Sequence, residues 1–187
     1  MNVFYLHNKP EICAKQHNDK HVVKMIVEYA QILSTAHRML DGEVYYEMSK
    51  NNRKIQRFFL NDEREKHLYK ACHYNHPSTK WARQSNNNYT WLYTLWYHLC
   101  KEYTHRYGKI HKTDADLRDW LHLVPNRIPV GYLTQPPPAM KKFPQCIVEG
   151  DSIQSYRNYY KVAKASFNIW TKRDAPEWIV EKVGASA

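Results

Sequence analysis

Polar and apolar positions near the N-terminus follow the period of one long helix. Residues 11–40 contain no Gly or Pro, Pro10 stands where a helix can begin, and Gly42 lies just past the predicted end. At about 100° per residue, the polar side chains fall along one line and the apolar side chains cover the opposite face. The polar stripe consists of His17, His21, Lys24, Glu28, Gln31 and Thr35. The apolar face consists of Val22, Ile26, Tyr29, Leu33, Ala36 and Leu40.

Short breaks and one proline-rich segment divide the remainder of the chain into further helices. Residues 43–60 are mixed in character, include the basic run at 50–57, and predict a mobile connection. Six prolines between 124 and 151 forbid a long helix there and predict an extended, wrapped segment. Helices are expected over residues 62–74, 79–107 (with an interruption at 85–88), 113–123 and 152–170. We therefore predict a mostly α, single-domain helical bundle with a long Pro-rich loop.

Length and composition limit the class of protein. The chain has 187 residues, which suits one domain, and none of its apolar runs approaches the roughly 18 residues that span a bilayer. The N-terminus lacks the layout of a signal peptide, so we expect a cytoplasmic protein, in the host cell if the source is viral. Four widely separated cysteines predict reduced thiols rather than disulfides. The sequence indicates no oligomeric state.

Basic charge and aromatic content together point to nucleic acid. Lys and Arg number 28 against 18 Asp and Glu, which gives a formal net charge of +10. The chain also has 15 Tyr, 6 Trp, 5 Phe and 11 His. Because positive charge attracts phosphates and flat rings stack on bases, a nucleic acid or nucleotide is the expected partner. The alternative is a basic globular protein whose rings pack in the core.

Motifs of several common enzyme classes are absent from the sequence. It contains no GxxxxGK[ST], GxGxxG or GxSxG motif, and no deaminase HxE motif with PCxxC. Kinase, dinucleotide-dependent and serine hydrolase activities therefore have no support, and no cofactor is predicted. His17 and His21 have the i, i+4 spacing of zinc ligands, but Asn18 stands where a zinc protease has Glu, and no third ligand follows. We therefore predict no metal site.

The first predicted helix supplies the candidate catalytic residues, which are Asp19, His21, Lys24 and Glu28. Asp19 lies at about 200° on the helical wheel, inside the apolar arc, where a carboxylate must be paired or protonated. It either ties down the chain near the helix start or serves as an acid or base with a shifted pKa. We expect Asp19 to be mostly buried and hydrogen-bonded. The polar stripe is expected to line one concave pocket beside Tyr156 and Arg157, although a polar stripe is also the ordinary solvated side of a helix.

Basic and aromatic residues are interleaved in further segments that are candidate DNA contacts. Asn side chains bond base edges, Trp and Tyr stack on bases, and Lys, Arg and His contact phosphates. Helix capping and core packing explain the same residues, so both interpretations stay open. Three prolines at 136–138, followed by Lys141 and Lys142, form a stiff basic loop that wedges a duplex, closes over a substrate or serves as a static wrap. The candidate phosphate- and base-binding residues are His17, Lys20, His37, Arg38, His76, Trp81, Arg83, Asn87, Tyr156, Arg157, Tyr160 and Lys164.

Three local strings carry a resemblance to a known family. They are EICAKQH at 11–17, LCKEYTHRYGK at 99–109 and SYRNYYKVAKA at 155–165. With their arrangement along the chain, these strings resemble the phage pyrimidine-dimer DNA glycosylases of the endonuclease V type, over about half of the sequence. The resemblance implies a fold of that type, binding to duplex DNA and base flipping. It does not carry over the catalytic pair, because residue 2 is Asn where the family exposes an N-terminal Thr, and Lys24 stands near the position of the family's catalytic Glu.

These observations lead to three alternative functions. The first is an enzyme that modifies a flipped pyrimidine in DNA, transferring a small amine or amino acid to an activated 5-hydroxymethyl group. A His/Lys cluster would suit the pyrophosphate leaving group, and Asp19 or Glu28 would deprotonate the amine. The second is a pyrimidine-dimer DNA glycosylase or AP lyase with an altered nucleophile. The third is a non-enzymatic DNA-binding or host-interaction protein, for which the polar stripe would face solvent or a partner instead of a cleft.

Overall fold

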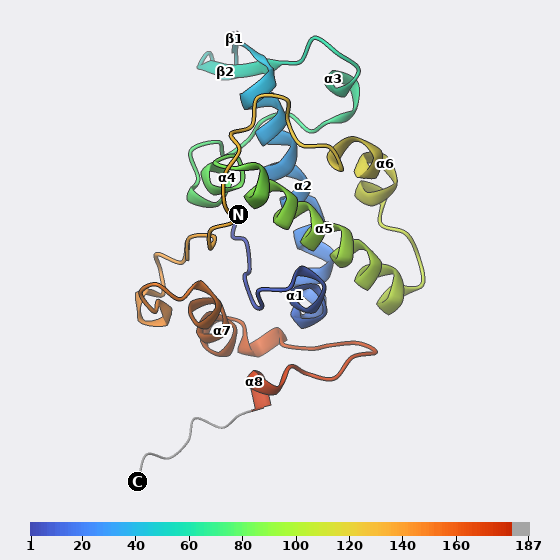
Figure 1. Ribbon diagram of the computed structural model, residues 1–187, viewed down its shortest axis with the longest axis vertical. Coiled ribbons are helices and arrows are strands. Elements are labelled where there is room, and N and C mark those ends of the chain that lie inside the picture. The colour runs from blue at the N-terminus through green and yellow to red at the C-terminus, as the bar shows by residue number, and fades with distance from the viewer. Residues whose placement is uncertain (181–187) are drawn as a thin grey trace.

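Two long helices, α2 (Asp19–Asp41) and α5 (Asn86–Tyr107), form the centre of the computed structural model, which describes residues 1–180. α1 (Pro10–Gln16) packs against α5, while α4 (Pro77–Ala82) and α6 (Lys112–Leu121) flank the pair (Figure 1). The described part of the chain is mostly helical, so the predicted fold class is confirmed at that level.

Two further helices, α7 (Ser152–Ala163) and α8 (Glu177–Val180), lie at the end of the molecule that α1 occupies (Figure 1). Two 3-10 turns, Pro144–Cys146 and Ala165–Phe167, flank α7, which ends earlier than the sequence predicted. Within residues 1–180, no helix combines the length and apolar character that crossing a membrane requires.

Apolar side chains from both central helices meet in one core. The predicted apolar face of α2 is confirmed, since Val22, Ile26 and Leu33 are fully buried. The indole N–H of Trp96 on α5 donates to the backbone oxygen of Ile26 at 2.9 Å, which ties the two helices together. Five of the largest fully buried side chains are aromatic: Trp96, Tyr29, Tyr89, Tyr156 and Tyr160. A large share of the aromatic content is therefore core packing, as the alternative interpretation of the composition held.

The predicted single helix over residues 11–40 is wrong, because the chain leaves the helical conformation between α1 and α2. His17 and Asn18 both adopt extended backbone angles. The Asn18 side chain then caps α2 by accepting the backbone N–H of His21 at 2.9 Å. This break places His17 outside the helical wheel on which the polar stripe was drawn.

Residues 43–60 form a β-hairpin, which corrects the prediction of a mobile connection. Strands β1 (Glu43–Met48) and β2 (Lys54–Phe59) pair antiparallel, and Glu47 accepts a 2.7 Å hydrogen bond from Arg57. Both strands are rich in β-branched and aromatic residues, which fit a two-stranded ribbon better than a loop. Only Arg64–His67 of the predicted helix at 62–74 is helical, as α3.

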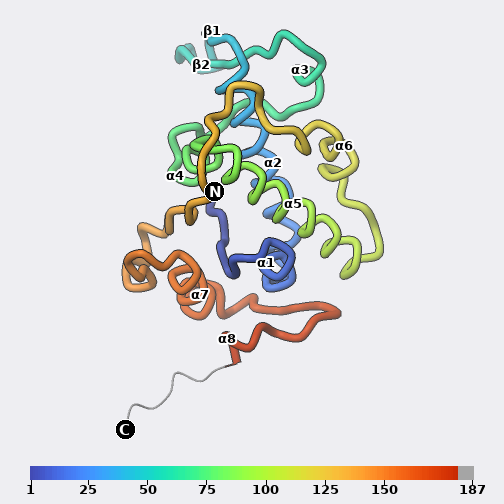
Figure 2. Tube along the Cα trace, in the orientation of Figure 1, coloured from blue at the N-terminus to red at the C-terminus, as the bar shows by residue number. Residues whose placement is uncertain are grey.

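Several chain-breaking signals were predicted correctly. The predicted interruption between α4 and α5 is present, but it lies at residues 83–85 instead of 85–88, because Ser85 caps α5 by accepting the N–H of Asn88 at 3.1 Å and residues 86–88 are helical. Gly108 ends α5 with a φ of 71°, a left-handed conformation that favours glycine. The Pro-rich segment runs as extended chain from α6 across the molecule to α7 (Figure 2).

Candidate functional site

The α1–α2 junction, made of His17, Asn18, Asp19 and His21, is built into the protein interior. His17 is fully buried, and its Nδ1 lies 2.8 Å from the backbone oxygen of Cys13. Because a carbonyl oxygen only accepts, Nδ1 carries the proton and Nε2 accepts from the Tyr29 hydroxyl at 3.0 Å. Burial lowers the pKa of His17 to about 4. His17 is therefore a neutral histidine with both nitrogens paired inside the protein.

His21 is also enclosed by protein groups. Its Nδ1 lies 2.6 Å from the hydroxyl of Tyr160 on α7, and Phe4 stacks on its ring with 4.2 Å between centroids. Only 4% of the residue is exposed, and burial lowers its pKa, with the charges of Lys164, Lys24 and Lys20 acting in the same direction. The predicted proximity of the first helix to α7 is confirmed for this pair, but Tyr160 is the partner instead of Tyr156 or Arg157.

Asp19 anchors the chain at the start of α2. Its carboxylate accepts hydrogen bonds from Arg106 at 2.9 Å and from both the backbone and the hydroxyl of Thr171 at 2.9 and 2.6 Å. Burial alone would raise the pKa of Asp19, but the hydrogen bonds from Thr171 and Arg106 outweigh burial and hold the pKa below its usual range. The expected hydrogen bonding is confirmed, but the expected burial is only partial, since 20% of the side chain is exposed. Arg106, with no exposed side-chain surface, also donates to the backbone oxygens of Lys15 and His17.

Half of the candidate phosphate- and base-binding residues lie in the interior. Arg38 is 2% exposed, and its guanidinium donates to Glu65 and to backbone oxygens that include those of Phe58 and Leu68. Because protein groups already take up the hydrogen bonds of this guanidinium, a phosphate does not reach it. The prediction that Arg38 binds phosphate is therefore wrong. The same burial applies to His17, His37, Trp81, Tyr156 and Tyr160.

The remaining candidates of that set reach the surface to different degrees. Lys20 and Asn87 are exposed, while Arg83 and Lys164 are half-buried. Lys164 lies over the ring of Tyr159 at 4.9 Å, and Lys20 lies over the ring of Phe167 at 4.4 Å. The half-buried residues His76 and Arg157 each line a cavity.

A cavity of about 530 Å³ opens between the start of α4, the end of the Pro-rich segment and α7. We call it the Pro-loop cavity. Its lining consists of His76, Pro77, residues 137–143 and Tyr159. Phe143 and Tyr159 meet edge to face with ring centroids 5.3 Å apart, while Lys141 and Lys142 are exposed. The cavity is thus an apolar, ring-containing space with positive charge beside it.

Charged groups from α2 and the N-terminus lie near the same cavity. The α-amine of Met1 is 3.8 Å from the Glu28 carboxylate, and Lys24 is 3.0 Å from it. Burial lowers the pKa of His76, and the charges of the α-amine and Lys141 lower it further while Glu28 raises it. The α-amine, Glu28 and Lys141 therefore all contribute to the electrostatic environment of His76. Figures 1 and 2 show the N-terminus beside α4 and the Pro-rich segment.

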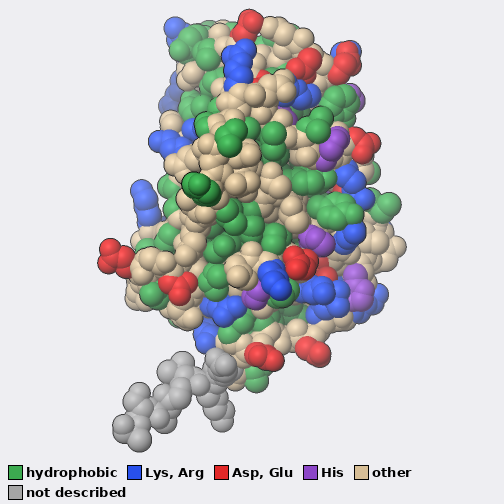
Figure 3. All heavy atoms as spheres, viewed as in Figure 1, with side chains coloured by type: hydrophobic (Ala, Val, Ile, Leu, Met, Phe, Trp, Pro, Cys, Tyr) green, Lys and Arg blue, Asp and Glu red, His purple; other side chains and the backbone are tan. Residues whose placement is uncertain are grey.

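The structure therefore divides the predicted polar stripe into two parts. His17 and His21 belong to the α1–α2 junction, whereas Glu28 lies beside the α-amine of Met1 and pairs with Lys24. Neither Lys24 nor Glu28 is part of the lining of the Pro-loop cavity. The residues Met1, Glu28, His76, Lys141 and Lys142 are called the cavity rim below. In Figure 3, hydrophobic side chains gather in the middle of the face where Figure 1 marks the N-terminus, with Lys and Arg to their left.

Sequence reasoning singled out the basic loop with Lys141 and Lys142 but did not connect it to Glu28 or to the α-amine. The proline run at 136–138 was the available signal for the loop. No sequence signal pairs it with α2, because more than a hundred residues separate them. Across residues 1–180, no three His, Cys, Asp or Glu side chains gather as metal ligands do.

Comparisons with known proteins add no relative. No protein-family model, no curated protein and no solved structure matches this chain.

Proposed function

We propose that this protein binds duplex DNA and takes a flipped base, a pyrimidine, into the Pro-loop cavity. The observation that carries the proposal is the ring-containing cavity of about 530 Å³ with two exposed lysines at its rim. This volume lies within the range of about 300–1,000 Å³ that small-ligand sites occupy. Tyr159 and Phe143 offer stacking surfaces for a base, and Lys141 and Lys142 offer positive charge for the flanking phosphates.

The chemistry we propose first is modification of the bound base by transfer of an amine or amino acid to an activated 5-hydroxymethyl pyrimidine. The incoming nitrogen forms a bond to the exocyclic carbon while the carbon–oxygen bond to pyrophosphate breaks. Glu28 takes the proton that the amine releases, and the lysines compensate the charge of the departing pyrophosphate. The Nδ1 of His76 accepts the N–H of Ser78, so the neutral ring offers its Nε2–H to the pyrophosphate as a hydrogen-bond donor. Asp19 has no part in this step, because its carboxylate is held by Arg106 and Thr171.

A second candidate, a pyrimidine-dimer glycosylase or AP lyase, is favoured by one ion pair. In a chain that begins at Met1, the α-amine lies 3.8 Å from Glu28. An amine beside a carboxylate suits attack on the sugar C1′, with loss of the base and formation of an imine, while the carboxylate stabilises the positive charge that develops on the sugar. This candidate, like the proposed kinship with the pyrimidine-dimer glycosylases, also draws on the strings at 11–17, 99–109 and 155–165.

Mass spectrometry of nucleosides separates these functions. DNA that carries activated 5-hydroxymethyl pyrimidine is incubated with the protein and a mixture of small amines and amino acids, and the digested nucleosides are analysed. A transferase yields an amine adduct from this DNA. A pyrimidine-dimer glycosylase or lyase leaves it unmodified and, with UV-irradiated DNA in its place, cuts a glycosidic bond at the dimer and gives a protein–DNA complex that borohydride traps. Glu28→Gln should abolish either product, since the amide cannot accept a proton. Binding of DNA without any product would instead support the non-enzymatic alternative.

The experiment includes a control variant and has one outcome that would contradict the proposal. Glu149→Gln removes one carboxylate from an exposed loop position and serves as the matched control that should keep full activity. Absence of both DNA binding and product would overturn the proposal. The expected place of this activity is the cytoplasm, of the host cell if the source is viral.

A further inference from the structure

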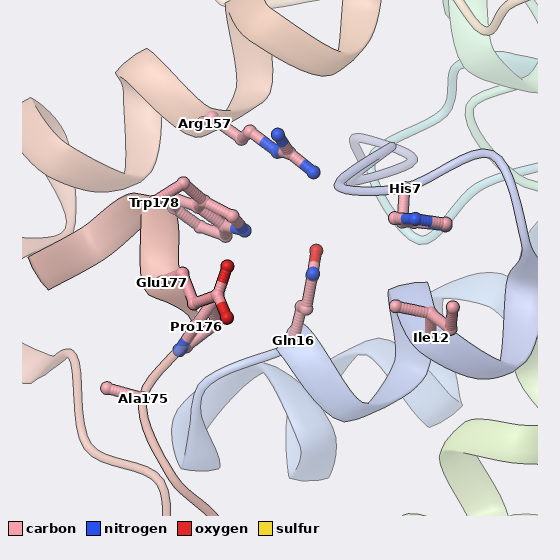
Figure 4. A pocket seen from close by; sticks show the side chains of 8 residues that line it. All are labelled: His7, Ile12, Gln16, Arg157, Ala175, Pro176, Glu177 and Trp178. Atoms are coloured by element: carbon pink, nitrogen blue, oxygen red, sulfur yellow. The ribbon is translucent and has the colours of Figure 1, made fainter. Parts of the chain in front are cut away.

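A second cavity, of about 490 Å³, lies between α1, α7 and α8. Figure 4 shows side chains from all three helices converging on it, and we call it the Trp178 cavity. Its lining shares no residue with the Pro-loop cavity. None of the functions considered above uses it.

Two buried polar atoms in this cavity have no hydrogen-bond partner. They are the indole nitrogen Nε1 of Trp178 and the side-chain oxygen Oε1 of Gln16. Trp178 is only 7% exposed, and in Figure 4 its indole nitrogen and the Gln16 amide both point into the open space. Because a buried donor or acceptor left unpaired destabilises a structure, this pair indicates a ligand that offers one acceptor and one donor.

Charged groups extend each of these two polar ends. The guanidinium of Arg157 lies 5.4 Å from the centre of the Trp178 ring, so positive charge stands beside the unpaired N–H. His7 accepts the backbone N–H of Lys9 on Nδ1 at 2.9 Å, which leaves Nε2–H of the neutral ring as a further donor. Figure 4 shows the carboxylate of Glu177 turned toward the cavity, near the Gln16 side chain. The cavity therefore has a donor side and an acceptor side.

We propose that the Trp178 cavity binds a free α-amino acid. The α-carboxylate accepts from Trp178 Nε1, on the side of the cavity where Arg157 lies. The α-ammonium donates to Gln16 Oε1 and to Glu177, and the side chain of the amino acid faces Ile12. A dianion such as phosphate is repelled by Glu177, and a simple amine leaves the Trp178 N–H unpaired. The proposal depends on this cavity alone and not on the chemistry at the Pro-loop cavity.

Isothermal titration of the DNA-free protein tests the assignment. The probes are a panel of the standard α-amino acids, with acetate, ethylamine and inorganic phosphate as partial analogues. At least one amino acid should bind, and acetate, ethylamine and phosphate should each bind at least about ten-fold more weakly. Failure of every amino acid to bind, or binding of phosphate or acetate as tightly as the amino acid, would overturn the proposal.

Two variants locate the binding site. Trp178→Phe keeps the ring but removes the N–H, and Glu177→Gln removes the charge; each should weaken binding about ten-fold or more. Glu149→Gln removes the same charge outside the cavity and should leave the affinity unchanged. Glu177 is exposed, so its variant is expected to fold even if Trp178→Phe does not. Amino acid binding that neither variant weakens would contradict this location.

Discussion

The α1–α2 junction and the cavity rim contain similar residue types, yet the fold uses them differently. At the junction, the side chains of His17 and His21 are enclosed, and each lies against a tyrosine hydroxyl of the core. At the rim, His76 is half-buried and Lys141 and Lys142 are exposed beside an open cavity. Composition and helical spacing did not separate the two regions, since the candidate catalytic residues Asp19, His21, Lys24 and Glu28 include members of both.

The physical difference between the two regions is the number of protein partners. Every polar side chain described at the junction has a protein partner. Water or a substrate would therefore have to displace an existing hydrogen bond. Burial also keeps the junction histidines neutral, because it lowers their pKa. A functional site needs polar groups whose bonding capacity is directed outward, and at the cavity rim the exposed side chains of Lys141 and Lys142 meet that requirement.

Arg106→Ala should give the largest loss of stability, because it breaks the junction. Arg106 is fully buried and binds Asp19, Glu102 and two backbone oxygens of the α1–α2 region. Removing one partner of a buried ion pair costs about 3–5 kcal/mol of unfolding free energy. Urea denaturation measures this change, with the exposed Lys109→Ala as the control that should stay within about 0.5 kcal/mol of the wild type. A loss below about 1 kcal/mol would show that the junction does not depend on Arg106.

Lowering the pH should destabilise the protein through its buried histidines. The folded-state pKa values of His17 and His37 are about 4, whereas an unfolded histidine titrates near about 6.5. Below about pH 6.5 the unfolded chain therefore binds protons that the folded chain does not, and stability falls until the pH reaches about 4. Each imidazole contributes a loss of about 1.4 kcal/mol per pH unit, or about 2 kcal/mol at pH 5.

Urea denaturation at pH 7, 6 and 5 measures that loss. The paired carboxylates of Asp19 and Glu102 have lowered pKa values, so their contribution is lost only at lower pH. In His17→Gln the dependence of stability on pH should be shallower than in the wild type, although the variant starts less stable. A flat profile between pH 7 and 5 would mean that the junction histidines are charged in the folded state.

Tyr29→Phe should remove one bond from the junction while keeping its packing. The Tyr29 hydroxyl accepts the N–H of Phe4 at 3.1 Å and pairs with Nε2 of His17 at 3.0 Å. Both groups are buried, so loss of the hydroxyl should cost about 1–3 kcal/mol in a thermal or urea denaturation experiment. Tyr132→Phe removes a hydroxyl from a residue that is 91% exposed and should have no measurable effect. Equal stability of the two variants would argue against a tightly bonded junction.

Changes at the cavity rim should have the smallest effect on stability. The double variant Lys141→Ala/Lys142→Ala should stay within about 0.5 kcal/mol of the wild type, since both side chains are exposed. Its affinity for duplex DNA should fall, and the slope of log affinity against log salt should become shallower by about 0.9 for each phosphate that the variant no longer neutralises. Fluorescence anisotropy at several salt concentrations measures both quantities.

The control for the rim is Lys109→Ala/Lys112→Ala, which removes two other exposed lysines and equal charge. Its salt slope should remain that of the wild type. If both double variants lose the same affinity, DNA is attracted by the net charge of +10 alone and not by the rim.

The sequence by itself determined the helical class and most of the chain breaks. Pro10, Ser85 and Gly108 act through their own backbone geometry or through a hydrogen bond within a few residues. Their effect can therefore be predicted without knowing the tertiary structure. The extended Pro-rich segment follows for the same reason. The apolar face of α2 was also readable, because helical periodicity is a local property. The same local reasoning missed the Asn18 cap. Because Asn18 caps α2, the predicted helix is broken at His17 and Asn18.

Only the tertiary structure decided which polar residues face a cavity. The partners of His21 and Asp19 are Tyr160 and Thr171, more than a hundred residues away in the sequence. The charges of Glu28 and Lys141 act on His76 across sequence separations that no periodicity encodes. Spacing along a helix fixes the direction of a side chain, but burial depends on what packs against that direction. In this protein, packing of α5, α7 and the Pro-rich segment decides which polar side chains are buried.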